Sequence, residues 1–199
     1  MKRLVDISIS LAALLALSPL MLVIAAVIKA TSAGPAFFRQ ERIGRNFSPF
    51  RIYKFRTMVR NADSMGRLLT CGADPRMTRV GRLLRKSKLD ELPQLLNVLK
   101  GDMSLVGPRP EVGKYVDLFP HEFRELLRVR PGITDLASLK YSNEAALLAR
   151  YPNPEQVYVE RILPDKIRLA KEYLERSSVL FDLNLIARTL HHVLSSRSA

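Results

Sequence analysis

The chain has 199 residues, which is long enough for one domain with a real core and does not by itself favour two domains. Its 32 lysines and arginines outnumber 19 aspartates and glutamates, and the net charge of +13 indicates an anionic partner such as nucleic acid, phospholipid or a phosphorylated substrate. The single cysteine excludes an internal disulfide framework, and the three histidines lack the cysteine partners and the spacing of a structural zinc site.

Residues 7–28 read ISISLAALLALSPLMLVIAAVI and carry no charge, so the run exceeds the roughly 18 apolar residues that a membrane segment needs. A cleavable signal peptide would begin in the same way, but no small-residue cleavage site introduces a polar chain before Lys29 closes the run. A buried core helix would need apolar surroundings on every side, which a chain of this size can hardly supply. The run therefore predicts insertion into a membrane.

The middle of this run contains Ser18 and Pro19, where proline removes a helix hydrogen bond and kinks the chain. Two arrangements fit a kink: a spanning helix, or a segment that turns back so that both ends emerge on one face of the membrane. Basic residues flank the run on both sides, so the positive-inside rule gives no clear asymmetry. The residues alone leave the choice open, with a slight preference for re-entry.

Short strands or a hairpin are expected between Pro35 and Phe55, where aromatic and β-branched residues lie near Gly44 and Pro49. An amphipathic helix is expected within residues 76–88, RMTRVGRLLRKSK, because basic residues recur there at three- and four-residue spacing. These are Arg79, Arg82, Arg85 and Lys86, with Val80, Leu83 and Leu84 on another face. A merely solvated basic face explains the spacing about equally well.

The next helix is expected over residues 89–99, with Pro93 tolerated in its first turn and Gly101 as its C-terminal stop. Asp90 and Glu91 then sit at a helix N-terminus, where the partial positive charge and the free amides favour carboxylates and bound phosphate alike. Capping and dipole complementarity are the ordinary explanation of such an acidic pair.

Two stiff loops follow, and each presents an arginine. VGPRPE, residues 106–111, holds Arg109 between two prolines, and VRPGIT, residues 129–134, holds Arg130 before a Pro-Gly turn. An arginine on a rigid loop suits bidentate contact with phosphate.

Three more helices are expected over residues 114–128, 163–175 and 178–194. The last of them carries apolar residues on one side, namely Leu180, Leu183, Ile186, Leu190 and Leu194. Core packing is the commoner explanation of such a stripe, and contact with a membrane surface is the alternative. Neither a P-loop nor a Gly-x-Gly-x-x-Gly fingerprint is present, so a nucleotide would have to be bound by other means.

An acidic pair among arginines makes chemical sense if a phosphorylated substrate binds between the carboxylates and the arginines. Arginines and a divalent cation would hold the phosphates while a carboxylate, Asp90, attacks phosphorus. Arg85, one turn earlier, and Arg109 on its stiff loop strengthen this hypothesis against simple capping.

Three motifs stand out: KFRTM at 54–58, KLDELPQLLNVLKGDMSLVGPRP at 88–110 and RPGIT at 130–134. Together with Ser-Pro inside an N-terminal membrane segment, they closely resemble the bacterial sugar transferase family, the small monotopic phosphoglycosyl transferases. The resemblance runs from the N-terminus to about Ala137 and more loosely to the end. The central motif is too long for chance to explain it.

The resemblance implies transfer of a sugar 1-phosphate from a UDP-sugar to undecaprenyl phosphate or another polyprenol phosphate, the first membrane step of a glycan or polysaccharide pathway. The family's aspartate attacks the sugar-bearing phosphorus and forms a covalent phosphosugar intermediate, so Asp90 takes that role by motif match. Glu91, with Asp90, is implied as a ligand of Mg²⁺. The residues expected to bind phosphate are Lys54, Arg85, Arg109 and Arg130.

The fold that the resemblance implies is α+β and mostly helical. A re-entrant membrane helix hairpin over residues 1–33, broken at Ser18 and Pro19, would precede a small cytoplasmic catalytic domain over residues 34–199 with a few short strands and interfacial amphipathic helices. Such a monotopic protein would lie on the cytoplasmic face of a bacterial inner membrane, in contact with phospholipid, with a homodimer left open. Asp135 follows Thr134 where many relatives have glycine, so the sugar is not identified.

A membrane-tethered basic module that binds lipid or nucleic acid without catalysis is the alternative. It would make binding depend on salt and would make Asp90 dispensable. The chain has no tryptophan for base stacking and no RNA-binding signature, so nucleic acid is not an expected partner.

Overall fold

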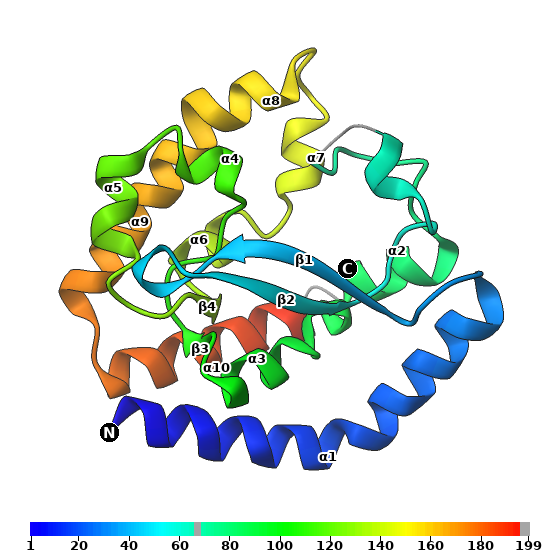
Figure 1. Cartoon of the computed structure of the whole chain (residues 1–199), viewed down its shortest axis with the longest axis horizontal. Helices are drawn as coiled ribbons and strands as arrows, with labels where there is room; N and C mark the ends of the chain where they lie inside the picture. Colours follow the sequence, from blue (N-terminus) through cyan, green and yellow to red (C-terminus); the bar gives the residue numbers. More distant parts are fainter. Residues whose placement is uncertain (66–68, 196–199) are drawn as a thin grey trace.

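The computed structural model describes residues 1–65 and 69–195 and has the predicted fold class, α+β and mostly helical (Figure 1). The α-helices are α1 (Lys2–Thr31), α2 (Arg79–Lys86), α3 (Gln94–Lys100), α4 (Gly113–Val116), α5 (Pro120–Leu126), α6 (Leu136–Lys140), α7 (Glu144–Leu148), α8 (Pro154–Val157), α9 (Leu163–Arg176) and α10 (Val179–Ser195). A 3-10 turn, Leu89–Glu91, precedes α3, and a π-helical turn, Tyr158–Ile162, joins α8 to α9.

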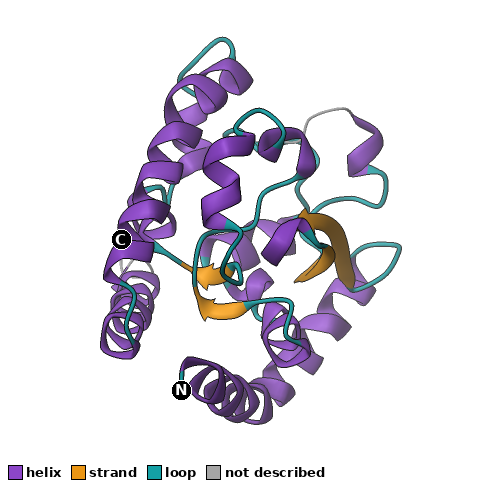
Figure 2. Cartoon of the chain, turned by 60° about the vertical axis from the view of Figure 1, so that its left-hand side comes forward, coloured by secondary structure: helices purple, strands orange, loops and turns teal. Residues whose placement is uncertain are grey.

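The strands form two separate pairs (Figure 2). The antiparallel pair β1 (Phe37–Ile43) and β2 (Pro49–Phe55) is the predicted hairpin. The second pair, β3 (Ser104–Val106) and β4 (Gly132–Thr134), is parallel and was not predicted. Its pairing brings Gly107, in the loop that follows β3, against Gly132 at the start of β4.

The apolar helix α1 is continuous through Pro19 and curves along one edge of the molecule (Figure 1). Pro19 has no N–H to donate to the carbonyl of Leu15, one turn earlier. The hydroxyl of Ser18 donates to that carbonyl instead, at 2.9 Å, so the bend leaves no orphaned acceptor there. The structure thus confirms a long apolar N-terminal helix that curves but is not interrupted at Ser18 and Pro19, and it does not show a hairpin of two arms.

Both ends of α1 pack against the body of the protein. Near its C-terminal end, Ile24 and Ile28 form a small core with Phe55 of β2 and Leu84 of α2. Near its other end, α1 packs on α3, which lies between α1 and β2, and a second core includes Val98 and Leu185. A third core joins α4, α5 and α9 around Tyr115, Phe123 and Leu163. The middle of α1 is left uncovered.

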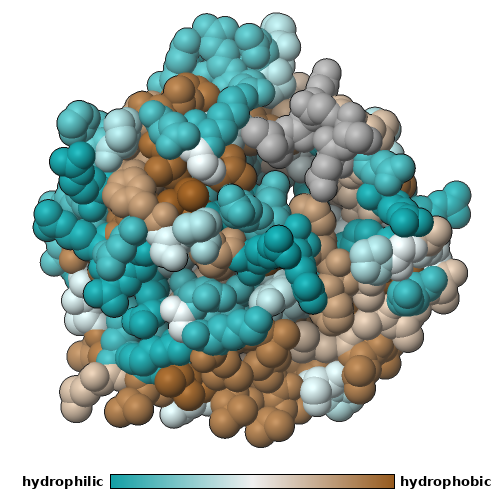
Figure 3. All heavy atoms as spheres, in the orientation of Figure 1, coloured by the Kyte–Doolittle hydropathy of each residue, from teal (hydrophilic) through white to brown (hydrophobic). Residues whose placement is uncertain are grey.

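Exposed apolar side chains mark this uncovered surface. Brown, hydrophobic atoms gather along the lower edge of Figure 3, over α1, whereas hydrophilic atoms dominate the upper part of that face. The exposed apolar side chains of α1 are Leu4, Leu11, Leu15, Leu20, Leu22, Val23 and Val27. Only 11% of the most apolar window of α1 is buried, so core packing does not explain its composition.

Three helix predictions need correction. The helix expected over residues 89–99 is a 3-10 turn followed by α3, and the one expected over 114–128 is split into α4 and α5 because Pro120 begins a new helix. Four of the five stripe residues on α10 face away from the core: the exposed fractions are 80% for Leu180, 42% for Leu183, 58% for Leu190 and 62% for Leu194. Ile186 packs against the second core, so the core-packing interpretation is wrong for the other four residues.

Candidate active site

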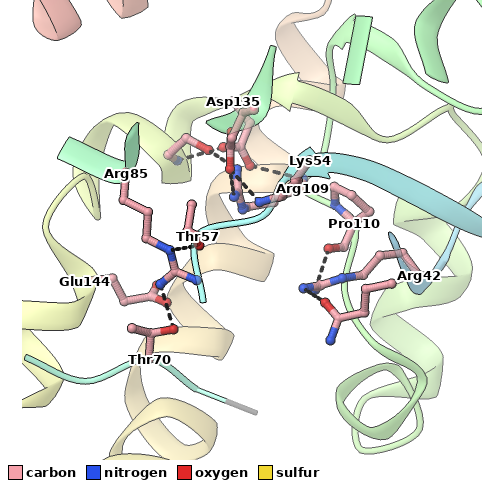
Figure 4. Close-up of polar contacts among 12 residues, drawn as sticks. Arg42, Lys54, Thr57, Thr70, Arg85, Arg109, Pro110, Asp135 and Glu144 are labelled. Carbon is pink, nitrogen blue, oxygen red and sulfur yellow. Dashed lines mark hydrogen bonds and ion pairs between the residues drawn. The ribbon is translucent and has the colours of Figure 1, made fainter. Parts of the chain in front are cut away.

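The centre of the site is a two-cation cluster on Glu91. Its Oε1 accepts a hydrogen bond from Lys54 Nζ and another from Arg109 Nη2, each at 2.7 Å. The three side chains come from the 3-10 turn, from β2 and from the loop after β3, so this contact joins segments far apart in sequence. Figure 4 shows Arg109 and Lys54 side by side at this point.

Burial and charge together set the protonation of the cluster. Burial alone would raise the pKa of Glu91, but the charges of Arg109 and Lys54 outweigh it and hold that pKa well below its usual range. The carboxylate of Glu91 in turn raises the pKa of Arg109. Burial lowers the pKa of Lys54, against the attraction of Glu91. Glu91 is therefore ionised at neutral pH.

Asp90 differs from Glu91 in its contacts and in the direction of its pKa shift. It is buried, and its carboxylate makes no hydrogen bond or ion pair within residues 1–65 and 69–195. Burial, reinforced by the negative charge of Glu91, raises its pKa, while Lys54 and Arg85 pull in the opposite direction. A buried carboxylate that is close to cations but bonded to none of them retains its lone pairs for a ligand or an electrophile.

The backbone that presents Asp90 is strained. Lys88 has φ 56°, the left-handed region that non-glycine residues adopt at a cost of about 1 kcal/mol or more. This turn ends α2 and lets the 3-10 turn begin at once, with the amide of Glu91 donating to the carbonyl of Lys88 at 3.2 Å. Strain of this kind persists only where the surroundings enforce it, and it directly precedes the acidic pair.

Arg85 lies across from the Glu91 cluster. Its Nε donates to the hydroxyl of Thr57 at 3.2 Å and its Nη1 to that of Thr70 at 2.8 Å (Figure 4). Gly81 makes this possible, because a Cβ there would lie 1.9 Å from the carbonyl oxygen of Thr57 and would push α2 away. Thr70 was not singled out in the sequence, since a lone threonine in an irregular segment carries no pattern.

The loop that carries Arg109 is fixed by backbone contacts. A Cβ on Gly132 would lie 2.1 Å from the amide nitrogen of Gly107, so the two glycines allow the loops to meet. Asp135 Oδ2 accepts the amide N–H of Arg109 at 3.2 Å. The residue that departs from the commoner family pattern thus holds the backbone of a predicted site residue.

Arg42 is a further basic side chain of this region that sequence reasoning passed over. Its Nη1 donates to the carbonyl of Pro110 at 3.1 Å and lies 3.6 Å from Glu111 Oε2 (Figure 4). Glu111 also accepts the hydroxyl of Tyr158 at 2.9 Å. In the sequence Arg42 is one of several arginines in a short basic stretch, and only the hairpin register turns it towards the loop.

Arg130 is not part of the cluster. Its Nε donates to the carbonyl of Gly101 at 2.7 Å, at the C-terminal end of α3, whereas Asp90 and Glu91 precede the N-terminal end of that helix. The structure brings together Asp90, Glu91, Lys54, Arg85 and Arg109, and it separates Arg130 from them. The predicted phosphate contact of Arg130 is therefore left out of the site.

The acidic pair fits a magnesium ion that is shared with a substrate. Mg²⁺ is commonly held by one or two carboxylates together with substrate phosphates and water. The described ranges 1–65 and 69–195 contain no group of three histidine, cysteine or acidic side chains that could hold a metal ion. Asp90 is unbonded and Glu91 uses only Oε1, so each has an oxygen to offer if the phosphates complete the coordination.

The chain is similar to sugar transferases along nearly its whole length. A family model described as "Bacterial sugar transferase" matches residues 1–196. The Bacillus subtilis protein "Uncharacterized sugar transferase EpsL" is 38% identical over 196 residues, which cover 98% of this chain and 88% of that protein. The Caulobacter vibrioides "UDP-glucose:undecaprenyl-phosphate glucose-1-phosphate transferase" is 40% identical over an alignment that covers 100% of this chain and 71% of that protein.

A third relative is longer. The Aeromonas hydrophila "UDP-N-acetylgalactosamine-undecaprenyl-phosphate N-acetylgalactosaminephosphotransferase" is 46% identical over 149 residues, which cover 72% of this chain and 35% of that protein. The chain therefore spans about a third of the length of this relative and most of the length of the other two.

Proposed function

Because the chain belongs to the bacterial sugar transferase family, we propose that it transfers a sugar 1-phosphate from a UDP-sugar to undecaprenyl phosphate or a related polyprenol phosphate. The products are a polyprenol diphosphate sugar and UMP. Two relatives whose names state transfer of glucose or N-acetylgalactosamine to undecaprenyl phosphate support this reaction. The observation that carries it is Asp90, a buried carboxylate that is unbonded within the described part of the chain and lies among cations.

In the first step, a carboxylate oxygen of Asp90 attacks the phosphorus that bears the sugar. The bond from that phosphorus to the bridging oxygen breaks, and UMP leaves with the bridging oxygen and its electron pair. Lys54, Arg85 and Arg109 surround the acidic pair and would stabilise the charge that develops on the phosphoryl oxygens, since positioned cations are the main means of stabilising such a transition state. Mg²⁺ bound by Asp90 or Glu91 would neutralise part of the same charge.

In the second step, a phosphate oxygen of the polyprenol phosphate attacks the phosphorus of the aspartyl phosphosugar. The bond to Asp90 breaks, and the free carboxylate is restored. Glu91 holds Lys54 and Arg109 in place through both steps because its Oε1 bonds them together. The acceptor phosphate enters already ionised, so the second step needs no strong general base.

The exposed apolar side chains support a membrane location. We infer that the middle of α1 enters the lipid and that both ends stay on the cytoplasmic side, since both ends pack on the body of the protein. The stripe on α10 would then contact the membrane surface with phospholipid around it. A site near the headgroups suits a reaction in which one substrate is soluble and the other keeps its phosphate at the membrane surface.

The topology can be tested at Pro19. Replacement of Pro19 by leucine restores the backbone donor and is expected to straighten α1, which favours a spanning orientation. A cysteine appended before Met1, in a Cys71→Ser background, would be labelled from outside intact spheroplasts by a membrane-impermeant maleimide only in the Pro19→Leu variant. Leu20→Ala, at the neighbouring exposed position, is the control that keeps the bend. Outside labelling of the protein with Pro19 intact would contradict re-entry.

The reaction itself is tested by UMP release from a panel of UDP-sugars, with the protein in nanodiscs, Mg²⁺ and undecaprenyl phosphate. UMP is expected with at least one donor, and a chelator is expected to suppress it. The donor that yields UMP identifies the sugar. If no donor yields UMP, while binding to anionic vesicles falls with salt, the chain is a basic binding module instead.

A further inference from the structure

Strand β3 is held from one side by the membrane helix. The amide N–H of Leu105 donates to Asp6 Oδ1 at 3.2 Å, and the hydroxyl of Ser104 donates to Asp6 Oδ2 at 2.8 Å. On its other edge β3 pairs with β4. The carboxylate of Asp6 therefore takes the place that a neighbouring strand would have on the free edge of β3.

Two side chains of the first turn of α1 also donate hydrogen bonds to backbone carbonyls of the body of the protein. Lys2 Nζ donates to the carbonyl of Val106 at 3.0 Å and pairs with Asp182 of α10. Arg3 Nη1 donates to the carbonyl of Val98 at 2.7 Å, in the last turn of α3. The first turn of α1 therefore holds β3, which ends just before the loop of Arg109, and the end of α3 that lies opposite the acidic pair.

The connection from β3 to Arg109 is short and stiff. Two residues, Gly107 and Pro108, separate the strand from Arg109. The amide of Gly107 donates to the carbonyl of Thr134 at 3.1 Å, and the carbonyl of Pro108 accepts the amide of Gly132 at 2.9 Å. Because only these two residues link β3 to Arg109, a shift of β3 together with β4 would move Arg109 relative to Glu91.

The burial of the Asp6 carboxylate is energetically unfavourable. It is 5% exposed, and no ion pair of its carboxylate occurs in residues 1–65 and 69–195. Burial of an unpaired carboxylate at the end of an apolar helix is expensive, and the two hydrogen bonds offset only part of the cost. An ionisable residue that is buried at such a cost is a candidate for a functional role.

We propose that Asp6 is a positioning residue for Arg109, which it sets through β3, so that the seating of α1 and the geometry of the phosphate-binding loop are coupled. The proposal rests on the phosphotransfer function proposed above. Asp6 itself does not contact the substrate. It acts on the reaction only through the placement of Arg109 relative to Glu91.

The test compares Asp6→Ala with Asp6→Asn by steady-state UMP release. Alanine removes both acceptors and is expected to lower kcat/KM about 10- to 100-fold, since small misplacement of a catalytic group costs this much. Asparagine keeps an acceptor for Leu105 and a polar partner for Ser104, so it is expected to stay within about threefold of the wild type. Ser10→Ala, at a buried position on the same helix without a hydrogen bond from its hydroxyl, is the matched control.

Two measurements separate positioning from general damage. In combination with Arg109→Lys, Asp6→Ala is expected to cost little more than Arg109→Lys alone, because there is no longer a guanidinium to position. Hydrogen exchange is expected to quicken at the amides of Leu105 and Arg109 in Asp6→Ala, with α9 unchanged. Ser104→Ala provides the same comparison if Asp6→Ala does not fold.

Multiplicative losses in the double variant, or faster exchange at Leu105 that does not reach Arg109, would overturn the proposal. The exchange measurement needs no turnover, so it decides the positioning role even if no UDP-sugar is a substrate. Absence of UMP release from the wild type would count against the proposed function instead.

Discussion

Replacement of Asp90 by asparagine is expected to lower UMP release by about 10³-fold or more while UDP-sugar binding is kept. The amide has nearly the same shape as the carboxylate, but its oxygen is a poor nucleophile, and removal of a nucleophile typically costs three or more orders of magnitude. Binding is expected to be equal or tighter, because one of two negative charges beside the diphosphate is removed. Turnover is measured by UMP release and UDP-sugar binding by calorimetry, both with the protein in nanodiscs.

Asp117→Asn is the matched control for this variant. Asp117 is an exposed aspartate at the end of α4, so its loss of charge is not expected to change turnover. Turnover that survives in Asp90→Asn would contradict the covalent mechanism. Loss of both turnover and UDP-sugar binding would instead assign Asp90 a role in binding.

Replacement of Glu91 by glutamine is expected to destabilise the protein and to reduce turnover. Glu91 Oε1 is the shared acceptor of Lys54 and Arg109, so its neutralisation leaves two partly buried cations without a counter-charge. Loss of a charged hydrogen-bond partner costs about 1–3 kcal/mol of unfolding free energy. Displaced cations are expected to lower kcat about 100-fold. Denaturant unfolding and UMP release measure the two effects, with the exposed Glu175→Gln as control.

The stability loss in Glu91→Gln has a defined pH dependence. The folded-state pKa of Glu91 is depressed, so its stabilisation is fully present above the unfolded value near 4.3 and is lost as the pH falls through the folded value. The difference between wild type and variant should thus be constant at neutral pH and shrink only in acid. A difference that grows in acid would show that Glu91 is not the ionised partner of these cations.

The fall of the turnover rate at low pH should follow the protonation of Asp90. Its pKa is raised by burial and by the charge of Glu91, so turnover is expected to fall in acid at a pH above the ordinary range of an aspartate. Glu91→Gln removes the repulsion and is expected to move this fall to lower pH in the activity that remains.

Elements with strong local signals were predicted well. The β1–β2 hairpin, α2, α9 and α10 all follow from alternation or helical spacing. Motif resemblance singled out Asp90, Glu91, Lys54, Arg85 and Arg109, and the structure brings these side chains together, whereas their roles in the reaction stay predictions. The long apolar helix was predicted from its composition, but the break expected at Ser18 and Pro19 is only a curve in a continuous helix.

Features that depend on distant contacts were not predictable from local patterns. Strands β3 and β4 have three residues each, too few for a periodic signal, yet their pairing decides where Arg109 and Arg130 lie. The two arginines occupy similar Pro-rich loops but meet different partners. The stripe on α10 could not be assigned to the core or to a membrane surface, because periodicity tells which residues share a face and not what that face meets.

The way α1 is held has a consequence for the choice of membrane. A spanning helix must match the thickness of the hydrocarbon layer, and mismatch is relieved by tilt or by deformation of the bilayer. With α1 inserted as proposed, its depth is limited by its own bend and by the two ends packed on the body, within a single leaflet. Bilayers whose acyl chains differ in length should therefore support the activity of the protein equally well. Changes at the surface of the leaflet that α1 enters should instead lower that activity.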